Sequence, residues 1–431
     1  MFRLGILSLF LAFSALSGAV LADEETLPLS MASSAPAAEG FHLAVLEPFE
    51  HRFSGLDSEA THAFLGQNGE IHDMGPLSEN GIFARDINDQ GQVVGTFSSR
   101  LDHNAQAFIW DRDKGKRPLS GDHADAYGIN NVGEVAGSSM AAGGKPHAIR
   151  WDAQGGRRDL GTLGGQESYA RAINDHGQVA GFSTLPSAQM HAFFWQDGAM
   201  SDLGTLGGHE SFAYALNPQG RVVGASIPAG ATLPHAFVWD QAGGMRDLGT
   251  LGGGWSEARA IDSAGRVVGF SNLKNGAIHA FLWDGKAGMR DLGTLGGRDS
   301  YAYGINKNGQ VVGMSIGPAG KAHAFLWSKA KGMKDLGTLG GTWSYAYGIN
   351  NRGQIVGISE IPTGGGSQLA AGGAAGDIPT GGFYGADSSS GGSNNNPTPT
   401  PVPEPATLTL CALGALALGA MGFRSRKSRT R

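Results

Sequence analysis

A unit of about 44 residues recurs along this chain, and this period constrains the fold more than any other feature of the sequence. The pattern His-Ala-Phe-x-Trp marks the unit; four copies are intact and three are weaker. The copies start at residues 62, 106, 147, 191, 235, 279 and 323, at intervals of 44 or 41 residues. A repeat of this length is typical of arrays in which neighbouring supersecondary units bury a shared core.

Two further patterns recur in the same order. Ile-Asn-x-x-Gly-Gln-Val-Val-Gly, or a close variant, begins at residues 87, 129, 173, 216, 261, 305 and 349. Asp-Leu-Gly-Thr-Leu-Gly-Gly is intact at residues 159, 202, 247, 291 and 335, with a degraded copy at Asp73. We expect the Gly-Gly pair to let the chain cross from one unit to the next.

Each unit contains four short runs with the composition of β-strands. In the unit near residue 300 these runs are Ser300 to Ile305, Gln310 to Ser315, Ala324 to Trp327 and Met333 to Leu339. Asn306 to Gly309 predicts a tight turn between the first two, because Asn bonds its own backbone and Gly accepts a positive φ. Helical periodicity is absent from the repeats.

Four strands in 44 residues match one blade of a β-propeller. The array opens with a His-Ala-Phe half-unit at His62 and closes with an Ile-Asn-Gly half-unit that ends near Ser359. Two strands from each half complete one blade, close the ring and remove the exposed sheet edges. The sequence therefore predicts an all-β propeller of seven four-stranded blades over residues 41–361. An open β-solenoid is the alternative, and it would need capping units.

The three patterns together resemble the HAF family of extracellular repeats, named for His-Ala-Phe. The resemblance covers roughly residues 60–358. It implies an exported, repeated β domain, and it implies no particular chemistry.

The first residues predict export. Arg3, an apolar run from Leu4 to about Leu21 and a small residue at Ala22 form the pattern of a secretory signal peptide over residues 1–22. A buried N-terminal helix is the alternative, but the acidic residues from Asp23 end the run where cleavage would occur. Residues 23–40 are predicted to be a linker.

The other end carries a three-part pattern within residues 402–431. Pro403-Glu404-Pro405 precedes an uncharged run over residues 406–423, and five basic residues follow. Eighteen helical residues span about 27 Å, enough for a bilayer core, and the basic tail favours the cytoplasmic side. The pattern resembles the PEP-CTERM sorting signal of Gram-negative bacteria. This resemblance implies processing by an exosortase and release to the cell surface; a permanent membrane anchor is the alternative.

The amino-acid composition limits which cross-links and partners the exported domain can have, and it indicates a disordered segment. Cys411 is the one cysteine and lies in the apolar run, so the exported domain is expected to have no disulfide. The formal charge of −6 falls to −11 once Arg3 and the +4 of the tail from Glu404 are left out. An acidic domain argues against nucleic acid as a partner. Residues 362–401, rich in Gly, Ser, Asn, Pro and Thr, are predicted to be a disordered stalk.

The units differ mainly after the Gly-Gly pair, and variation on a constant scaffold is where recognition is expected. The pairs are Gln166-Glu167, His209-Glu210, Gly254-Trp255, Arg298-Asp299 and Thr342-Trp343. We interpret Trp255, Trp343, Glu167, Glu210, Arg298 and Asp299 as candidate binding residues at one mouth of the ring. Aromatic and charged groups together suit a sugar. Sugar binding predicts that both tryptophans are exposed.

Other features favour structural roles. The recurrent His is expected to bond within its own unit, the recurrent Asp to serve a turn or a link between units, and the Trp to pack between units. Glu167 and Glu210 occupy equivalent positions, so a glycosidase pair is conceivable. However, the sequence lacks a sialidase box, a nucleophile elbow and a His-Glu-x-x-His motif. We predict no enzyme activity, no metal and no cofactor.

The predicted function is an exported surface or matrix module, with exopolysaccharide or a surface protein as partner. A protein–protein scaffold without a small-ligand site and a propeller glycan hydrolase or lyase are the alternatives.

Overall fold

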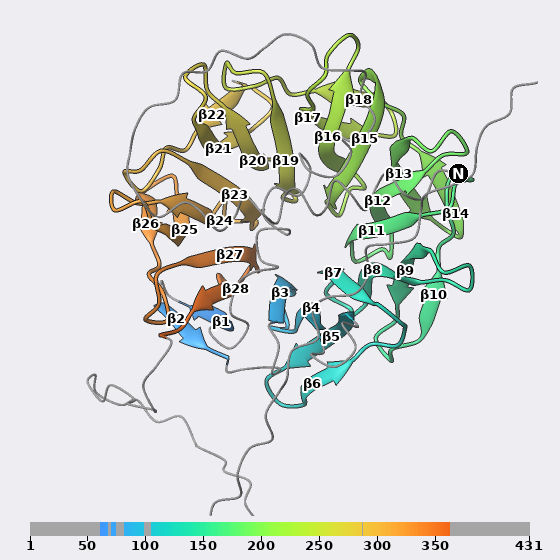
Figure 1. Cartoon of the computed structure of the whole chain (residues 1–431), viewed down its shortest axis with the longest axis horizontal. Helices are drawn as coiled ribbons and strands as arrows, with labels where there is room; N and C mark the ends of the chain where they lie inside the picture. Colours follow the sequence, from blue (N-terminus) through green and yellow to red (C-terminus); the bar gives the residue numbers. More distant parts are fainter. Residues whose placement is uncertain (1–60, 68–69, 75–81, 99–104, 287, 363–431) are drawn as a thin grey trace, which may run out of the picture. The chain divides into compact units, whose positions relative to one another are not determined.

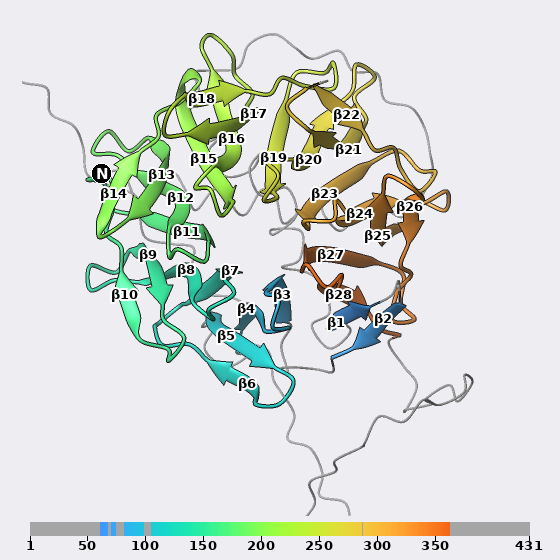
Figure 2. The same ribbon diagram turned by 180° about the vertical axis from the view of Figure 1, so that it is seen from behind.

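The computed structural model of the chain describes residues 61–67, 70–74, 82–98, 105–286 and 288–362, and these form a β-propeller (Figures 1 and 2). The strands of this part form seven four-stranded antiparallel sheets, or blades. Neighbouring innermost strands contact one another all the way around the axis. The predicted seven-bladed fold is therefore confirmed, and the open solenoid is wrong.

Six blades follow the chain order from the innermost strand outward. They are blade 1 with β3 (Ile82–Ile87), β4 (Val93–Ser98), β5 (Ala105–Asp111) and β6 (Gly115–Pro118); blade 2 with β7 (Asp125–Ile129), β8 (Val135–Met140), β9 (Pro146–Trp151) and β10 (Arg157–Asp159); blade 3 with β11 (Ser168–Ile173), β12 (Val179–Thr184), β13 (Met190–Gln196) and β14 (Ala199–Asp202); blade 4 with β15 (Gly207–Leu216), β16 (Val222–Pro228), β17 (His235–Asp240) and β18 (Gly244–Asp247); blade 5 with β19 (Ser256–Ile261), β20 (Val267–Asn272), β21 (Ile278–Trp283) and β22 (Met289–Asp291); and blade 6 with β23 (Ser300–Ile305), β24 (Val311–Ile316), β25 (Ala322–Ser328) and β26 (Gly332–Asp335).

Blade 7 is made from both ends of the described chain. Its inner strands are β27 (Ser344–Ile349) and β28 (Ile355–Glu360), and its outer strands are β1 (Thr61–Gln67) and β2 (Glu70–Asp73). β1 pairs antiparallel with β28 from Thr61 opposite Glu360 to Gly66 opposite Ile355. The predicted closure by two strands from each end is confirmed.

One predicted strand is longer than the observed one. The fourth run was predicted from Met333 to Leu339, but β26 ends at Asp335. The strand stops there because the Asp335 carboxylate accepts the N–H of Gly337, which turns the chain toward the next blade. Leu336, 7% exposed, packs in the core from the crossing segment.

The core lies between the blades. One cluster joins Val223 and Ala236 of blade 4 to Ala258, Val267 and Phe281 of blade 5, all fully buried. Clusters of the same kind recur around the ring, and the recurrent tryptophans belong to them; Trp151, Trp195 and Trp327 are at most 4% exposed. Each blade is therefore stabilised mainly by its neighbours, and the predicted packing of Trp between units is confirmed for these residues.

A glycine in each second strand shapes the innermost strand. A Cβ at Gly313 would lie 1.9 Å from the carbonyl oxygen of Tyr301, so only Gly allows the two strands to approach. A β-bulge follows on β23, where the pairing shifts between Ala302 and Gly304. Bulges of this kind re-aim a side chain, here that of Tyr303. The same bulge occurs in all seven blades.

Asparagines at the turns after the innermost strands link the blades into a ring. Asn174 is buried, its side-chain Oδ1 accepts the N–H of Gln178 within its own turn, and its Nδ2 donates to the Asn217 carbonyl of the next blade at 3.0 Å. Equivalent links run from residues 88, 130, 217, 306 and 350. The last of these, from Asn350 to the Asn88 carbonyl, spans the junction between the two chain ends.

One position interrupts this asparagine ring. Asp262 stands where the other blades have Asn, and a carboxylate has no N–H to donate. Arg266 replaces the missing link: its Nε donates to the Asp262 carboxylate at 2.6 Å, and its Nη2 donates to the Lys307 carbonyl of blade 6 at 2.8 Å.

The asparagine ring can be tested with a reciprocal pair of substitutions. Asn174→Asp removes a buried donor and sets a carboxylate against the Asn217 carbonyl, so we expect a loss of about 1–3 kcal/mol in the free energy of unfolding. Asp262→Asn supplies the missing amide while it weakens the Arg266 contact, so we expect a change within about 1 kcal/mol. Urea unfolding measures both. Equal losses in the two variants would contradict a linking role for the amide donor.

Candidate binding face

The crossing segments between blades form one end of the propeller, opposite the asparagine turns. Each leads from an outermost strand to the next innermost strand and is held by its own hydrogen bonds. Between β22 and β23, the Asp291 carboxylate accepts the N–H of Gly293 at 2.7 Å, and the Thr294 hydroxyl donates to the Gly297 carbonyl at 2.9 Å. The N–H of Leu295 donates to the Ser315 hydroxyl at 2.9 Å. These hydrogen bonds hold the backbone of the crossing segment in one conformation, which we call the crossing cage.

The Gly-Gly pair makes this cage possible. Gly296 has a φ of +103°, and a Cβ at Gly297 would meet the Ile316 carbonyl oxygen at 2.5 Å. A left-handed conformation followed by a close backbone approach requires glycine at both positions. The predicted role of Gly-Gly in crossing between units is confirmed.

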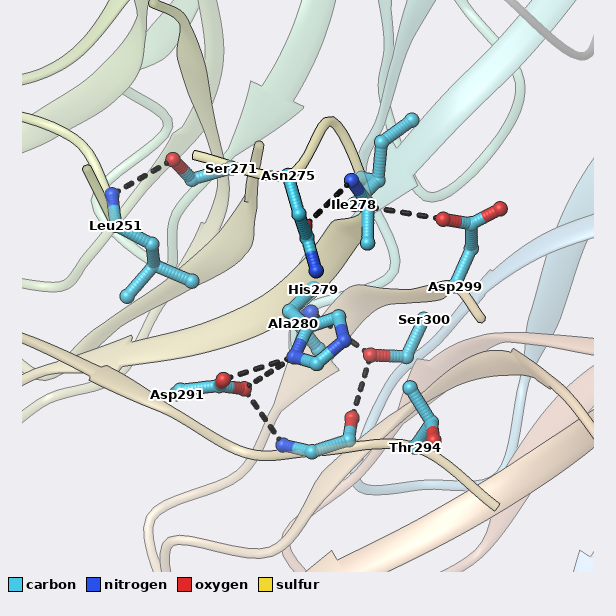
Figure 3. A network of polar contacts seen from close by, with 12 residues as sticks. Leu251, Ser271, Asn275, Ile278, His279, Ala280, Asp291, Thr294, Asp299 and Ser300 are labelled. Carbon is cyan, nitrogen blue, oxygen red and sulfur yellow. Dashed lines mark hydrogen bonds and ion pairs between the residues drawn. The ribbon is translucent and has the colours of Figure 1, made fainter. Parts of the chain in front are cut away.

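A serine at the start of the innermost strand joins the crossing to the preceding blade (Figure 3). The Ser300 hydroxyl accepts the N–H of Ala280 in blade 5 at 2.9 Å and donates to the Gly293 carbonyl at 2.6 Å. Ser168, Ser211, Ser256 and Ser344 make the same pair of bonds. These hydroxyls therefore belong to the joints between blades.

The recurrent His bonds the recurrent Asp within its own blade, as predicted. His279 Nδ1 lies 2.8 Å from an Asp291 oxygen, and the pair recurs in six blades of the described ring. Ser, His and Asp thus lie near one another, but the geometry differs from that of a hydrolase triad. The Ser300 hydroxyl is fully buried, and its proton is committed to the Gly293 carbonyl, which leaves no activated nucleophile.

The acidic candidates at the crossings are engaged in local contacts. Glu167 Oε1 pairs with Lys145 Nζ at 2.8 Å, and Glu210 is only 4% exposed. Asp299 Oδ1 accepts the N–H of Ile278 in blade 5 at 2.9 Å (Figure 3). The carboxylates of Glu167 and Asp299 thus hold neighbouring groups in place, and a direct part of any of the three acidic residues in ligand binding stays a prediction.

Arg298 and the two tryptophans present more of their surface. The Arg298 side chain is 68% exposed and donates to the Gly276 carbonyl at 3.2 Å. Trp255 and Trp343 are each partly exposed, whereas a sugar site predicts that both are exposed. Trp255 packs edge-on against Phe270, with ring centroids 5.9 Å apart, and Trp343 packs against Tyr345 at 5.3 Å. One side of each indole is thus fixed by a neighbouring ring.

Below the crossings, the bulged residue of each innermost strand contributes to a second ring around the axis. We call this set the axial belt: Arg85, Tyr127, Arg171, Tyr214, Arg259, Tyr303 and Tyr347. The arginines at this register were not identified from the sequence. The signal was present in the sequence, because Arg alternates with Tyr two residues before the Ile of each Ile-Asn pattern.

Neighbouring members of the axial belt contact one another across blades. The Arg171 guanidinium carbon lies 4.1 Å from the Tyr127 ring centroid, and that of Arg259 lies 4.2 Å from the Tyr214 centroid. The Tyr303 and Tyr347 rings are 5.5 Å apart. These contacts therefore join blade 2 to blade 3, blade 4 to blade 5 and blade 6 to blade 7.

Glu257 is a buried carboxyl beside the belt, at a register where five blades carry Phe or Tyr. It is fully buried, and Oε2 pairs with Arg259 Nη2 at 2.9 Å. Burial raises the pKa of Glu257 to about 7, and the nearby Arg259 charge only partly opposes this rise. The carboxyl therefore titrates near neutral pH.

At the opposite end of the axis, the asparagine turns surround a cavity of about 190 Å³. All seven blades line it, with Ile or Leu from the ends of the innermost strands and polar residues from the turns. Many of these polar groups already bond the neighbouring blade; the Asp89 carboxylate, for example, accepts both the N–H and Nδ2 of Asn351. These groups serve the closure of the ring.

The described residues contain no cluster of three His, Cys, Asp or Glu side chains placed to hold a metal. They also contain no helix long and apolar enough to cross a membrane. The predicted helix over residues 406–423, the signal peptide, the linker and the stalk lie outside the described residues.

Comparison with known families gives one match. The model of the PEP-CTERM protein-sorting motif matches residues 401–427, which include Pro403, Glu404 and Pro405. This motif implies export, anchoring in the membrane and recognition by an exosortase system. The assignment of the repeats to the HAF family stays a prediction, and no curated protein matches the chain.

Several solved structures are similar to the propeller at low identity. TolB from Acinetobacter baumannii is 12% identical with a TM-score of 0.42, and the match covers 62% of this chain and 63% of that chain. The β-propeller domain of the Trilobed protease from Pyrococcus furiosus is 13% identical (TM-score 0.44; 60% and 84% covered). The BP39L lectin from Burkholderia pseudomallei is 9% identical (TM-score 0.41; 62% and 88% covered). Values of this size carry no functional information.

Removal of a serine hydroxyl from one of these joints is expected to lower the stability of the propeller. Ser300→Ala leaves the buried N–H of Ala280 without its acceptor, so we expect a loss of about 1–3 kcal/mol in the free energy of unfolding. Ser263→Ala, at an exposed turn, is the control and should change it by less than about 0.5 kcal/mol. Ester hydrolysis by the wild type that Ser300→Ala abolishes at unchanged stability would contradict a structural role.

Glu257 predicts a pH-dependent stability. Its folded pKa lies above the usual value of 4.5, so its contribution is greatest below that pH and is lost as pH rises through about 7. Glu257→Gln removes this titration, and we expect it to gain up to about 3 kcal/mol on the wild type between pH 5 and pH 8. Urea unfolding at both pH values measures the difference. A constant gap between the two proteins would show that Glu257 does not titrate in this range.

Proposed function

We propose that this chain is an exported cell-surface or matrix module that binds exopolysaccharide at the crossing face of its propeller. The observation that carries the proposal is the constant crossing cage. Its hydrogen bonds recur in five crossings, while the two residues after Gly-Gly change from blade to blade. Rigid backbones that present variable side chains are suited to recognition, because little conformational entropy is lost on binding.

The side chains at these positions support a carbohydrate ligand. Trp255 and Trp343 each keep part of an indole accessible while a second aromatic ring supports the other side. Sugar rings have apolar faces that pack on such surfaces, and their hydroxyls need polar partners nearby. Arg298, 68% exposed between the two tryptophans in blade order, supplies donors.

The sorting motif supports the same setting, since it implies that the propeller is presented outside the cytoplasm. A binding module without catalysis fits the buried crossing serines, whose protons are committed to backbone carbonyls. We therefore propose binding alone, with Glu167, Glu210 and Asp299 as positioning residues rather than as an acid–base pair.

Substitution of the two tryptophans tests the proposal. The full-length protein in a mild detergent is assayed for binding to a panel of immobilised neutral and acidic polysaccharides. We expect Trp255→Ala/Trp343→Ala to weaken binding about tenfold or more, because aromatic anchors dominate such interfaces.

The matched control is Trp283→Ala. Trp283 is a partly exposed tryptophan on β21, where Arg246 lies over its ring, and it belongs to the core cluster between blades 4 and 5. Its removal should leave binding unchanged. Absence of binding to every polysaccharide would overturn the proposal and favour a protein–protein scaffold.

A further inference from the structure

The cavity of about 190 Å³ at the asparagine-turn end of the axis has an apolar wall. The last residue of each innermost strand forms this wall, and the seven side chains are Ile87, Ile129, Ile173, Leu216, Ile261, Ile305 and Ile349. The six isoleucines are 4–9% exposed, so each belongs to the core and keeps a small surface that lines the cavity. An alkyl group in the cavity therefore meets hydrocarbon from all seven blades.

The second residue of each asparagine turn forms the rim of the cavity. We call these the rim residues: Asp89, Asn131, Asp175, Pro218, Ser263, Lys307 and Asn351. In four blades the N–H of the rim residue donates to a side-chain oxygen of the next rim residue. Pro218 and Lys307 offer no side-chain acceptor, so these links are interrupted between blades 3 and 6. The rim residues of blades 4–6 are exposed, and the cavity can be entered from solvent there.

Two rim residues are carboxylates that no Lys, Arg or His of the described part of the chain pairs with. The Asp89 carboxylate accepts the N–H and Nδ2 of Asn351 at 2.8 and 2.9 Å. The Asp175 carboxylate accepts the same two groups of Asn131 at 2.7 and 3.0 Å. These neutral amides hold both carboxylates in place without neutralising their charge. A carboxylate has about four acceptor sites, so about two stay available on each.

The other charged groups that line the cavity are Asp262 and Lys307. The Asp262 carboxylate is buried and already paired with Arg266, whose Nε donates to it at 2.6 Å. Lys307 is exposed on the opposite side of the rim from Asp89 and Asp175. Two carboxylates without a cation and one ammonium group leave the rim with a net negative charge.

We propose that this axial cavity binds an aliphatic ammonium group, with the alkyl chain against the Ile and Leu wall and the ammonium on the carboxylates of Asp89 and Asp175. An ammonium group has three N–H donors and no acceptor, which suits two anchored carboxylates. A lysine side chain of a partner protein and a free alkyl amine carry the same chemistry. The cavity lies at the other end of the axis from the crossing face, so this inference goes beyond the proposed function and does not depend on it.

Binding of matched small molecules to the full-length protein tests the inference. N-acetyl-lysinamide and pentylammonium carry the charge, whereas N-acetyl-norleucinamide has the alkyl chain of lysine without the ammonium group. Calorimetry and saturation-transfer NMR measure the affinities at about 50 mM and about 500 mM NaCl. We expect both amines to bind more tightly than N-acetyl-norleucinamide, and we expect their binding to weaken with salt.

Neutralising the carboxylates should weaken binding of the amines alone. Asp89→Asn and Asp175→Asn should each weaken binding of N-acetyl-lysinamide about threefold, and together about tenfold, because each removes one charge from a site open to solvent. The affinity for N-acetyl-norleucinamide should stay unchanged. Asn is the native rim residue of blades 2 and 7, where its Oδ1 accepts the N–H of the preceding rim residue, so both variants can keep that link.

Lys307→Gln changes the rim charge in the other direction and should strengthen binding of N-acetyl-lysinamide about twofold at low salt. Asp197→Asn is the matched control, because Asp197 is exposed in the hairpin between β13 and β14 and does not line the cavity. Its affinity should equal that of the wild type. Circular dichroism and thermal unfolding check that every variant is folded. Should an aspartate variant not fold, Lys307→Gln still tests the inference.

Every outcome decides the inference. Equal affinity for N-acetyl-lysinamide and N-acetyl-norleucinamide overturns it, as does binding of neither. Affinity for the amines that the folded Asp89 and Asp175 variants leave unchanged, or that Lys307→Gln lowers, also overturns it. Tighter binding of N-acetyl-lysinamide than of pentylammonium supports a lysine side chain as the ligand, and the reverse order supports a free amine. Polysaccharide binding at the crossing face is measured separately and stands or falls with Trp255 and Trp343.

Discussion

The pairing of β1 with β28 is the interaction on which the rest of the structure depends. Six described blades could stack on one another in an open array, but the edges of such an array would expose unpaired backbone groups and an apolar face. The antiparallel register from Thr61–Glu360 to Gly66–Ile355 joins the chain ends within one sheet. The amide of Asn350 then bonds the Asn88 carbonyl, and the asparagine ring crosses the same junction. Closure therefore gives every blade two neighbours.

Closure also explains why the repeat tolerates so little change at its joints. Each blade buries its faces against its neighbours; the second-strand glycine recurs in all seven blades, the turn asparagine in six and the crossing serine in five. Where the asparagine changes, a neighbour compensates. At Asp262 the amide donor is lost, and Arg266 reaches both the carboxylate and the next blade instead. Compensation within four residues indicates that the link between blades matters more than the residue that provides it.

The sequence predicted the architecture well because its signals are periodic. The 44-residue spacing, the Asn306–Gly309 turn and the split terminal unit specify the strand order, the blade count and the closure. The end of the fourth strand was misplaced by four residues, because the leucines of the crossing segment are as apolar as a strand. Their burial comes from the neighbouring blade, and a single unit read alone does not contain that information.

The candidate site was less predictable than the fold. The crossing residues were identified as candidates by their place after the Gly-Gly pair. That place did not show which of them are exposed to solvent: Arg298 is 68% exposed and Glu210 is 4% exposed. Exposure there depends on which neighbour each side chain meets. The arginines of the axial belt were overlooked for a related reason: their register is set by a bulge. In the sequence, Arg171 is one more polar residue of a strand. Only the bulge seen in the structure places its side chain against Tyr127.

The bulge suggests how one repeated scaffold provides an asymmetric site. A glycine on the second strand fixes the backbone at the bulge in every blade, and the bulged side chains pack mainly against those of neighbouring blades. Tyr and Arg can then exchange at this register without disturbing the joints between blades. Arg stands at this register in blades 1, 3 and 5 and Tyr in blades 2, 4, 6 and 7, so that a guanidinium of one blade lies over a tyrosine ring of a neighbouring blade. Sevenfold packing alone would favour one residue type at all seven positions.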